Sequence, residues 1–245
     1  MDPLDLAIAA ARSAATLLRS HFGTALNVNA LEAHDIKLEL DVQCQALITG
    51  MILAEFPDHA IYGEEGLAGN QSSPFHWIID PIDGTVNFFY GIPHFCISIA
   101  LRQGSELILG VICDPIRDEL WQVRKGGPAL LNGKPCAVST RATIPEAILS
   151  VGFSKTKTTI DSGLPLFQDM VYRARKCRLM GSAALDMAYV ASGRLDGYIE
   201  QSVSLWDVAA GVLLVEAAGG SVRMEPRADN PDKLSIVATN GLIPV

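Results

Sequence analysis

The sequence lacks the long hydrophobic run that a membrane-spanning helix requires. Such a helix needs about 20 consecutive, mostly apolar residues, and no stretch of this 245-residue chain approaches that length. A secretory signal peptide would begin with basic residues, whereas the first charged residues here are Asp2 and Asp5. With neither feature present, we expect a cytoplasmic protein.

Positive charge and paired cysteines are also scarce. Lys and Arg total 19 against 27 Asp and Glu, for a formal net charge of −8, which disfavours a protein that holds nucleic acid through its phosphates. The cysteines are odd in number and show no CxxC spacing, which favours reduced thiols over a zinc site. They are Cys44, Cys96, Cys113, Cys136 and Cys177. Apolar residues still make up 49% of the chain, which is ample for a core.

The first part of the chain shows helical and then strand-like patterns. Helical spacing predicts one helix from Pro3 to about Gly23 and a second over about residues 41–56, whose apolar face includes Leu47. From Trp77 onward, short apolar runs separated by turn residues predict strands, with a hairpin turn at residues 132–133.

The second part, after about Ile144, alternates between strand and helix patterns. We therefore expect an α+β half over residues 1–143 and an α/β half over residues 144–245, sharing one continuous body. No repeat or low-complexity linker separates the two halves.

The stretch "WIIDPIDGTVNF" places two carboxylates at the end of an apolar strand. Pro81 stiffens the turn, so Asp80 and Asp83 can face one point, and the backbone N–H groups of Gly84 and Thr85 can open a helix toward an anion. This pattern suggests a divalent, oxygen-ligated cation beside a phosphate. The alternative is a plain turn in which an aspartate caps a helix.

Other acids lie at comparable places in the chain. Glu64 and Glu65 follow a short predicted strand in "IYGEEG", and Asp207 stands at a helix start in "SLWDVAAG". Each alone also fits an acidic loop or a helix cap. Together they fit a two-metal phosphoryl-transfer site, in which two cations about 3.5–4 Å apart clamp the reacting oxygens.

In this order, "GEE", "WIIDPIDGTVNF" and "WDVAAG…EAAGG" resemble the three signatures of the inositol monophosphatase family. "GIPHFCISIAL", "LNGKP" and "GSAALDMAYVASGRLDGYIE" agree with it. The resemblance covers nearly the whole chain. It implies a layered αβαβα sandwich like that of inositol monophosphatase and fructose-1,6-bisphosphatase, and a Mg²⁺-dependent, lithium-sensitive phosphomonoesterase.

The resemblance also implies the ligands of two Mg²⁺ ions and, in relatives, a weaker third near Glu64. The first ion would bind Glu64, Asp80 and the backbone carbonyl of Ile82, and the second would bind Asp80, Asp83 and Asp207. We therefore expect two or three Mg²⁺ per site.

Catalytic and substrate roles follow from the same resemblance. Thr85, paired with Asp41, matches the group that helps activate the attacking water, and Glu64 belongs to the same catalytic set. The implied substrate contacts are Asp83, Gly84, Thr85, Ala183 and Glu200.

The chain departs from the family pattern in two places. Relatives read "DxVTxxD" where this chain reads "DIKLELD", and a lysine upstream of that segment is missing. Lys37 either reaches the phosphate instead or lies with Glu39 on a solvated strand face. Lithium sensitivity and third-metal binding are open for this reason. The chain also ends at Val245, where relatives continue into a final helix, so we expect bare apolar surface or a partner subunit there.

Several functions share this metal core. The favoured hypothesis is hydrolysis of inositol monophosphate. The alternatives are hydrolysis of histidinol phosphate, fructose 1,6-bisphosphate or 3′-phosphoadenosine 5′-phosphate. Lys155 and Lys157 are the candidates for contacting a second phosphate, although their loop fits a lid equally well. The resemblance implies a homodimer acting on a small phosphorylated polyol, and the composition predicts neither a membrane nor a nucleic-acid partner. A non-catalytic binding role is the other class, for which a basic run offers either a solvated helix face or a patch for RNA or protein: Arg173, Arg175, Lys176 and Arg178.

Overall fold

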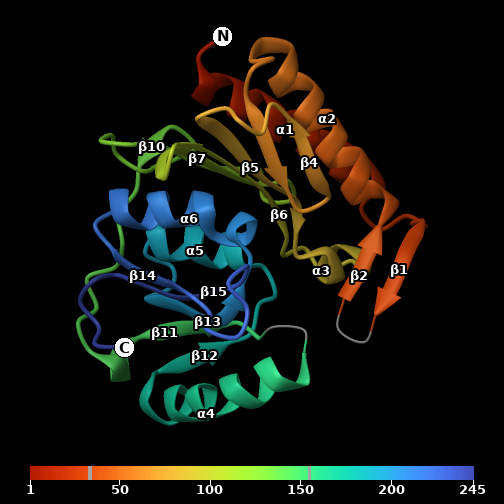
Figure 1. The fold of residues 1–245 in the computed structure, drawn as a ribbon. Helices are drawn as coiled ribbons and strands as arrows, with labels where there is room; N and C mark the ends of the chain where they lie inside the picture. The colour runs from red at the N-terminus through yellow and green to blue at the C-terminus, as the bar shows by residue number, and fades with distance from the viewer. Residues whose placement is uncertain (33–34, 154–155) are drawn as a thin grey trace.

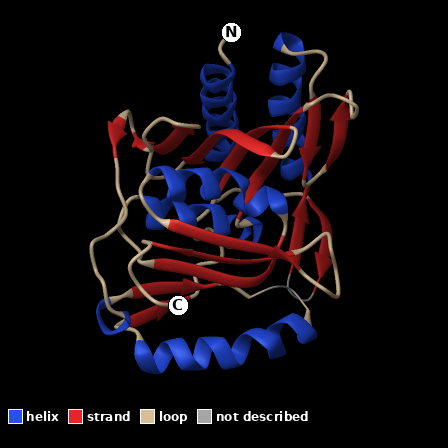
Figure 2. Ribbon diagram, turned by 60° about the vertical axis from the view of Figure 1, so that its left-hand side comes forward, coloured by secondary structure: helices blue, strands red, loops and turns tan. Residues whose placement is uncertain are grey.

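Helices and sheets alternate in five layers in the computed structural model, which describes residues 1–32, 35–153 and 156–245. The helices of these layers are α1 (Pro3–His21), α2 (Glu39–Glu55), α4 (Lys157–Arg173), α5 (Ala183–Ala191) and α6 (Leu205–Ala217). In Figure 1, α1 and α2 cover one face of a large sheet, α5 and α6 lie between it and a second sheet, and α4 covers the far side of the second sheet. Figure 2 shows the same layers from another direction, with the N-terminus at the α1 end. The predicted αβαβα sandwich is confirmed.

Eight strands form the large sheet, in the order β10-β9-β8-β7-β6-β5-β3-β4. They are β3 (Ala60–Gly63), β4 (Gly66–Gly69), β5 (Phe75–Asp83), β6 (Cys96–Gln103), β7 (Glu106–Asp114), β8 (Glu119–Arg124), β9 (Leu130–Leu131) and β10 (Lys134–Pro135). Successive side chains of β5 alternate between the faces: Ile78 joins the core under α5 and α6, and Ile79 joins the core under α1 and α2. The predicted hairpin turn joins β9 to β10, with φ of 48° at Asn132 and 74° at Gly133.

The helix α1 follows the predicted pattern. Asp2 caps it by accepting a hydrogen bond from the backbone N–H of Leu4 at 2.9 Å, and Pro3 occupies the first turn. Its alanine-rich stripe is buried in the core between this helix and the large sheet.

The helix α2 buries Cys44, Ile48 and Ile52, which are four residues apart and therefore share one stripe. Leu47 is 36% exposed, so its predicted place on the apolar face was wrong. It is offset by about 100° from Ile48, which turns it toward the edge of the buried stripe.

A two-stranded antiparallel ribbon, β1 (Val28–Glu32) with β2 (Asp35–Leu38), precedes α2 and lies beside the short helix α3 (Thr85–Phe89). The sequence patterns did not predict this ribbon. They also missed β4, a glycine-rich edge strand, because neither segment alternates in hydrophobicity over more than a few residues.

Five strands form the second sheet, in the order β12-β11-β13-β15-β14. They are β11 (Ile148–Val151), β12 (Lys176–Arg178), β13 (Gly197–Val203), β14 (Ser221–Pro226) and β15 (Leu234–Thr239). A short 3-10 turn, Ile144–Glu146, leads into β11. The edge strand β14 was not predicted, because most of its residues are exposed and its hydrophobic pattern is weak.

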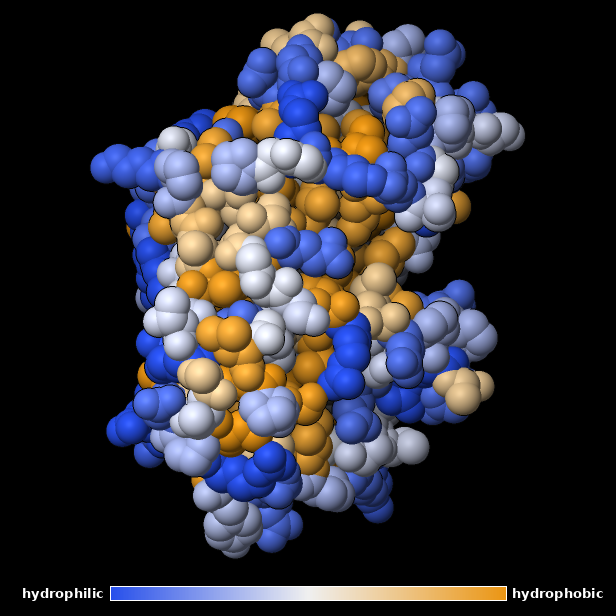
Figure 3. All heavy atoms as spheres, turned by 90° about the vertical axis from the view of Figure 1, so that its left-hand side faces the viewer, coloured by the Kyte–Doolittle hydropathy of each residue, from blue (hydrophilic) through white to orange (hydrophobic). Residues whose placement is uncertain are grey.

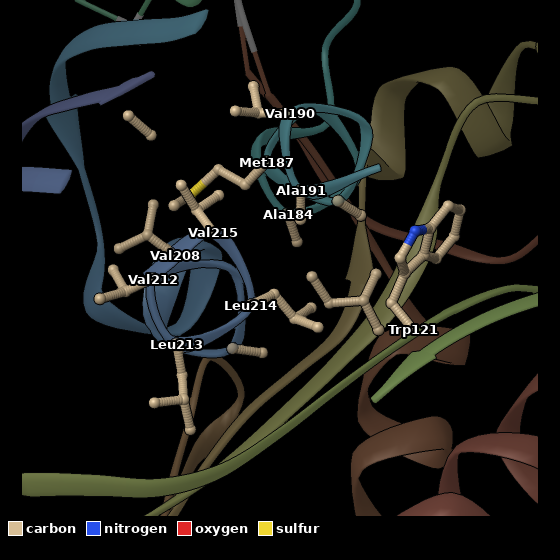
Figure 4. Close-up of a cluster of buried hydrophobic side chains, with 14 of the residues drawn as sticks. Trp121, Ala184, Met187, Val190, Ala191, Val208, Val212, Leu213, Leu214 and Val215 are labelled. Atoms are coloured by element: carbon tan, nitrogen blue, oxygen red, sulfur yellow. The ribbon is translucent and has the colours of Figure 1, made fainter. Parts of the chain in front are cut away.

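The middle layer ties the two sheets into one core. Figure 4 shows α5 and α6 side by side, with Met187 beside Val208 and Val215, and Leu214 on the side toward Trp121 of the large sheet. Both helices are buried almost all round. Both helices pack on the large sheet as well as on the second sheet, so their packing does not separate the chain into two halves. The division at residue 143 therefore stays a prediction. Within the described ranges, no helix is long and apolar enough to cross a membrane.

Candidate active site

A cavity of about 640 Å³ opens where β5 and β13 meet the starts of α3, α5 and α6. Residues from both predicted halves of the chain line it. The charged lining residues are Lys37, Glu64, Asp80, Asp83, Asp186, Glu200, Asp207 and Lys233. Acids therefore outnumber cations in this cavity, which suits a site for a metal cation.

The end of β5 carries the two aspartates singled out in the sequence. Where a turn was predicted between the two aspartates, the strand continues through Asp83, with an irregularity in its pairing to β6 between the two residues. Asp80 is 2% exposed, and its Oδ1 accepts a hydrogen bond from the backbone N–H of Ile82 at 3.0 Å. The irregularity replaces the predicted turn and lets both carboxylates line one cavity.

Asp83 is held by the start of α5. Its Oδ2 accepts hydrogen bonds from Ser182 Oγ at 2.7 Å and from the backbone N–H of Ala184 at 2.6 Å, and its Oδ1 accepts one from Ala183 at 3.3 Å. Burial raises the pKa of Asp83 to about 7 and Asp207 adds to the rise, while the bonds from Ser182 and Ala184 oppose it.

Asp80 experiences the strongest crowding of negative charge. Burial raises the pKa of Asp80 well above its usual value, and repulsion from Glu64, Asp83, Asp207 and Asp41 raises it further. These acids come from separate parts of the sequence, and Glu64, Asp80, Asp83 and Asp207 all line the same cavity.

Asp207 lies in the first turn of α6, three residues after the N-cap Ser204. Its Oδ2 accepts a hydrogen bond from the backbone N–H of Ser204 at 2.7 Å, as in a capping box. The ammonium of Lys233 donates to Ser204 Oγ at 2.6 Å and lies 5.9 Å from the centre of the Trp206 ring. The positively charged side chain of Lys233 thus lies beside the start of α6, which carries Asp207.

Thr85 and Asp41 form the predicted pair. Thr85 Oγ1 donates to Asp41 Oδ1 at 3.3 Å and to the carbonyl of Ile82 at 3.0 Å, and Asp41 Oδ2 accepts from the backbone N–H of Leu38. Burial raises the pKa of Asp41 to about 7. A carboxyl group with such a pKa is suited to exchange protons near neutral pH.

Gly84 links the aspartates to α3 in a conformation that other residues avoid. Its φ is 99°, and a Cβ built there would lie 3.1 Å from the backbone oxygens of Gly181 and His94. The position therefore requires glycine, and both Gly84 and Thr85 line the cavity.

Glu200 lies on β13 and lines the cavity from the second sheet. Burial raises the pKa of Glu200 to about 8, against a hydrogen bond from the Tyr198 hydroxyl that lowers it. Ala183, the other predicted substrate contact, lies at the start of α5 on the same cavity.

The donor set fits a divalent cation that prefers oxygen ligands. Glu64, Asp80, Asp83 and Asp207 line one cavity, and a cation among them would relieve the repulsion on Asp80. Among the described residues, no three His, Cys, Asp or Glu side chains already stand in a metal-binding arrangement. Asp83 and Asp207 each hold an oxygen on backbone N–H groups at a helix start, so we expect carboxylates to reorient when a cation binds.

Most predicted site residues line this cavity, although their roles stay predictions. Asp41 lies behind Thr85, to which it is hydrogen-bonded. Lys37 is exposed on β2 and lines the cavity. The predicted strand face was wrong for Glu39, which begins α2 and accepts a hydrogen bond from Asn27. Lys157 begins α4 and does not belong to the lining, and Lys155 lies outside the described residues.

Sequence reasoning missed several lining residues: Ser182, Asp186, Tyr198, Trp206 and Lys233. Strand alternation could have found Tyr198, because it stands two residues from Glu200 on β13. For Lys233 there was no local signal, because its loop approaches α6 only in the folded chain.

The fold and this acidic cavity are those of a known class of protein. The model of the inositol monophosphatase family matches residues 2–241, so the chain belongs to this family. That family consists of phosphatases that generally depend on Mg²⁺.

Individual relatives carry different names. The chain is 39% identical over 231 residues to the Nus factor SuhB of Pseudomonas aeruginosa, covering 91% of this chain and 85% of that protein. It is 37% identical over 245 residues to the fructose-1,6-bisphosphatase/inositol-1-monophosphatase of Thermotoga maritima, covering 99% and 93%. The crystal structure of the extragenic suppressor protein suhB from Bartonella henselae superposes with a TM-score of 0.90 at 32% identity, covering 98% of this chain and 94% of that one.

Proposed function

We propose that the chain is a Mg²⁺-dependent phosphomonoesterase that hydrolyses inositol monophosphate to inositol and phosphate by attack of an activated water. The observation that carries this proposal is that Glu64, Asp80, Asp83 and Asp207 line one cavity, where burial and then repulsion from the other acids raise the pKa of Asp80. Family membership supports the reaction class.

The ligand assignment follows the resemblance and the donor set. Glu64, Asp80 and the carbonyl of Ile82 would hold one Mg²⁺, and Asp80, Asp83 and Asp207 would hold another. Bound Mg²⁺ would offset the negative charge of the phosphate ester and of the oxygen that leaves. A third ion near Glu64 and sensitivity to lithium remain predictions.

The water is activated by residues of the chain itself. Thr85 Oγ1 can accept a proton from water while its own proton passes to Asp41, to which it is hydrogen-bonded at 3.3 Å. Because burial raises the pKa of Asp41 to about 7, this carboxyl can hold the proton at neutral pH. Glu64 belongs to the same catalytic set by resemblance.

The substrate lies between the sheets in this proposal. Backbone N–H groups of Gly84 and Thr85 contact the phosphate, while Glu200 and Ala183 contact hydroxyl groups of the leaving alcohol. Lys37 is a further candidate for the phosphate, because it lines the same cavity and is otherwise exposed. Histidinol phosphate, fructose 1,6-bisphosphate and 3′-phosphoadenosine 5′-phosphate are the alternatives that the resemblance implies, and one relative is named a fructose-1,6-bisphosphatase/inositol-1-monophosphatase.

A phosphate-release screen tests the reaction and the substrate together. The four phosphate esters are offered with Mg²⁺ and with EDTA. We expect Mg²⁺-dependent release that is fastest with inositol 1-phosphate. Phosphate release that EDTA does not reduce would contradict the metal assignment. Faster release from another ester would show that inositol monophosphate is not the preferred substrate.

The remaining partner and location assignments rest on resemblance. We propose a homodimer in the cytoplasm. Figure 3 shows hydrophobic atoms running down the middle of one face, and such a face is compatible with a partner subunit. Size determination in solution tests the dimer.

A binding role is the second candidate, favoured by the name of the Pseudomonas relative, a Nus factor. Arg175, Lys176 and Arg178 are exposed on or beside β12, an edge strand and not the expected helix face, while Arg173 ends α4 and pairs with Asp169. Partner capture with an Asp207→Asn variant, alongside phosphate release, separates the two roles: a binding role predicts that capture survives the loss of activity.

A further inference from the structure

The hydroxyl of Tyr198 is hydrogen-bonded to the carboxylate of Glu200. Tyr198 Oη donates a hydrogen bond to Glu200 Oε2 at 2.5 Å, and both residues project from the same face of β13. Tyr198 is 1% exposed, so the packing around its ring holds the hydroxyl in place. The carboxylate of Glu200 is therefore oriented by a rigid donor that is itself part of the second sheet.

The same carboxylate oxygen packs on the backbone of Gly152. A Cβ built at Gly152 would lie 1.7 Å from Glu200 Oε2 and 2.5 Å from Cδ. The N–H of Gly152 donates to the carbonyl of Ile199 at 2.8 Å, which fixes this close approach between β11 and β13. Oε2 thus has the Tyr198 hydroxyl and the Gly152 backbone as its neighbours.

The other oxygen of Glu200 remains for a ligand. Glu200 lines the cavity, and within the described part of the chain no group donates a hydrogen bond to Oε1. Burial, and then repulsion from Asp207, Asp83 and Asp186, raise the pKa of Glu200 to about 8, and the hydrogen bond from Tyr198 opposes this rise.

We infer that Tyr198 is a positioning residue for substrate recognition, a statement that rests on the proposed phosphatase function. Tyr198 and Gly152 fix Oε2, so that Oε1 of Glu200 is aimed to accept a hydrogen bond from a hydroxyl of the leaving alcohol. A phosphate ester whose leaving group has no hydroxyl gains nothing from this arrangement. Tyr198 therefore sets the preference for polyol phosphates over plain phosphate esters.

Two variants and two substrates test this inference. Tyr198→Phe keeps the ring and removes the donor, and Gly152→Ala pushes the end of the Glu200 side chain from its place while the backbone stays. Inositol 1-phosphate carries hydroxyl groups on its leaving alcohol, whereas 4-nitrophenyl phosphate carries none. Tyr62→Phe is the matched control, because it also removes a tyrosine hydroxyl but not one that is bonded to Glu200. The centre of the Tyr62 ring lies 5.5 Å from the centre of the Trp206 ring.

The inference predicts a selective loss. Tyr198→Phe should raise KM for inositol 1-phosphate by about tenfold, the usual scale for one hydrogen bond to a charged group, with little change in kcat. Gly152→Ala should do the same, and neither variant should alter KM or kcat for 4-nitrophenyl phosphate. Tyr62→Phe should leave both substrates unaffected.

Two results would overturn the inference in distinguishable ways. If the wild-type protein hydrolyses both substrates and Tyr198→Phe changes them equally or not at all, Tyr198 has no positioning role. If the wild-type protein releases phosphate from neither substrate, the proposed function itself is wrong and the inference falls with it.

Discussion

Asp83 and Ala184 are 101 residues apart in the sequence, yet the backbone N–H of Ala184 donates a 2.6 Å hydrogen bond to Asp83 Oδ2. The carboxylate of a proposed metal ligand on the large sheet therefore caps a helix of the middle layer. That helix carries Ala183, a proposed substrate contact. If Asp83 moves when a cation binds, the start of α5 is expected to move with it. The metal and substrate parts of the site are therefore physically linked.

Asp83→Asn should abolish most of the activity and spare the fold. The amide keeps the size and one acceptor oxygen but removes the charge from the cation site, so we expect phosphate release to fall by about 100-fold or more. Asp83→Ala also removes the acceptor of the Ala183 and Ala184 N–H groups at the start of α5 and should cost about a further 1 kcal/mol of unfolding free energy. Steady-state kinetics and denaturant unfolding in EDTA measure the two effects. Wild-type-like turnover by Asp83→Asn would remove this residue from the site.

Most of the fold could be predicted from periodicity and turn residues. The helix from Pro3 and the hairpin turn at Asn132 were found because each has a strong local signal. The strand β14 and the ribbon of β1 and β2 were missed because their pairing, not their hydrophobic pattern, makes them strands. Leu47 was misplaced because a contiguous apolar run does not show where the buried stripe of a helix ends.

The site could be predicted only in part. Strand ends and helix starts pointed to Asp80 and Asp207, and the family resemblance supplied the roles. The cap on Asp83 and the contact of Lys233 with Ser204 depend on how α5 and α6 pack between two sheets. No local pattern encodes such packing.

Thr85→Ala should slow the reaction without weakening metal binding. Thr85 Oγ1 bridges Asp41 and the carbonyl of Ile82, and loss of a general acid–base group typically costs about 10²–10⁴-fold in rate. We expect kcat to fall within that range while Mg²⁺ affinity changes little. Thr85→Ser keeps the hydroxyl and serves as the control. Equal loss in both variants would argue for a packing role of the methyl group.

The stability of the metal-free protein should fall as pH rises. Asp41 and Asp83 have folded-state pKa values of about 7, above the 3.8 of an unperturbed aspartate, so the folded state holds protons that the unfolded state has released. The unfolding free energy should therefore decrease from about pH 4 to about pH 7. Urea unfolding in EDTA at pH 5 and pH 8 measures this slope. Mg²⁺ should flatten it, and a metal-free protein that is more stable at pH 8 would contradict the arrangement of acids.

Magnesium binding to the wild-type protein and to Asp80→Asn is the most direct test of the account, because Asp80 is the acid on which the other four act. Titration calorimetry follows the binding, and circular dichroism checks that the variant is folded. We predict that the wild type binds Mg²⁺ and that the variant binds it at least about tenfold more weakly, as expected when a ligand charge is lost. Equal affinity in the two proteins would contradict the claim that these distant acids converge to hold a metal.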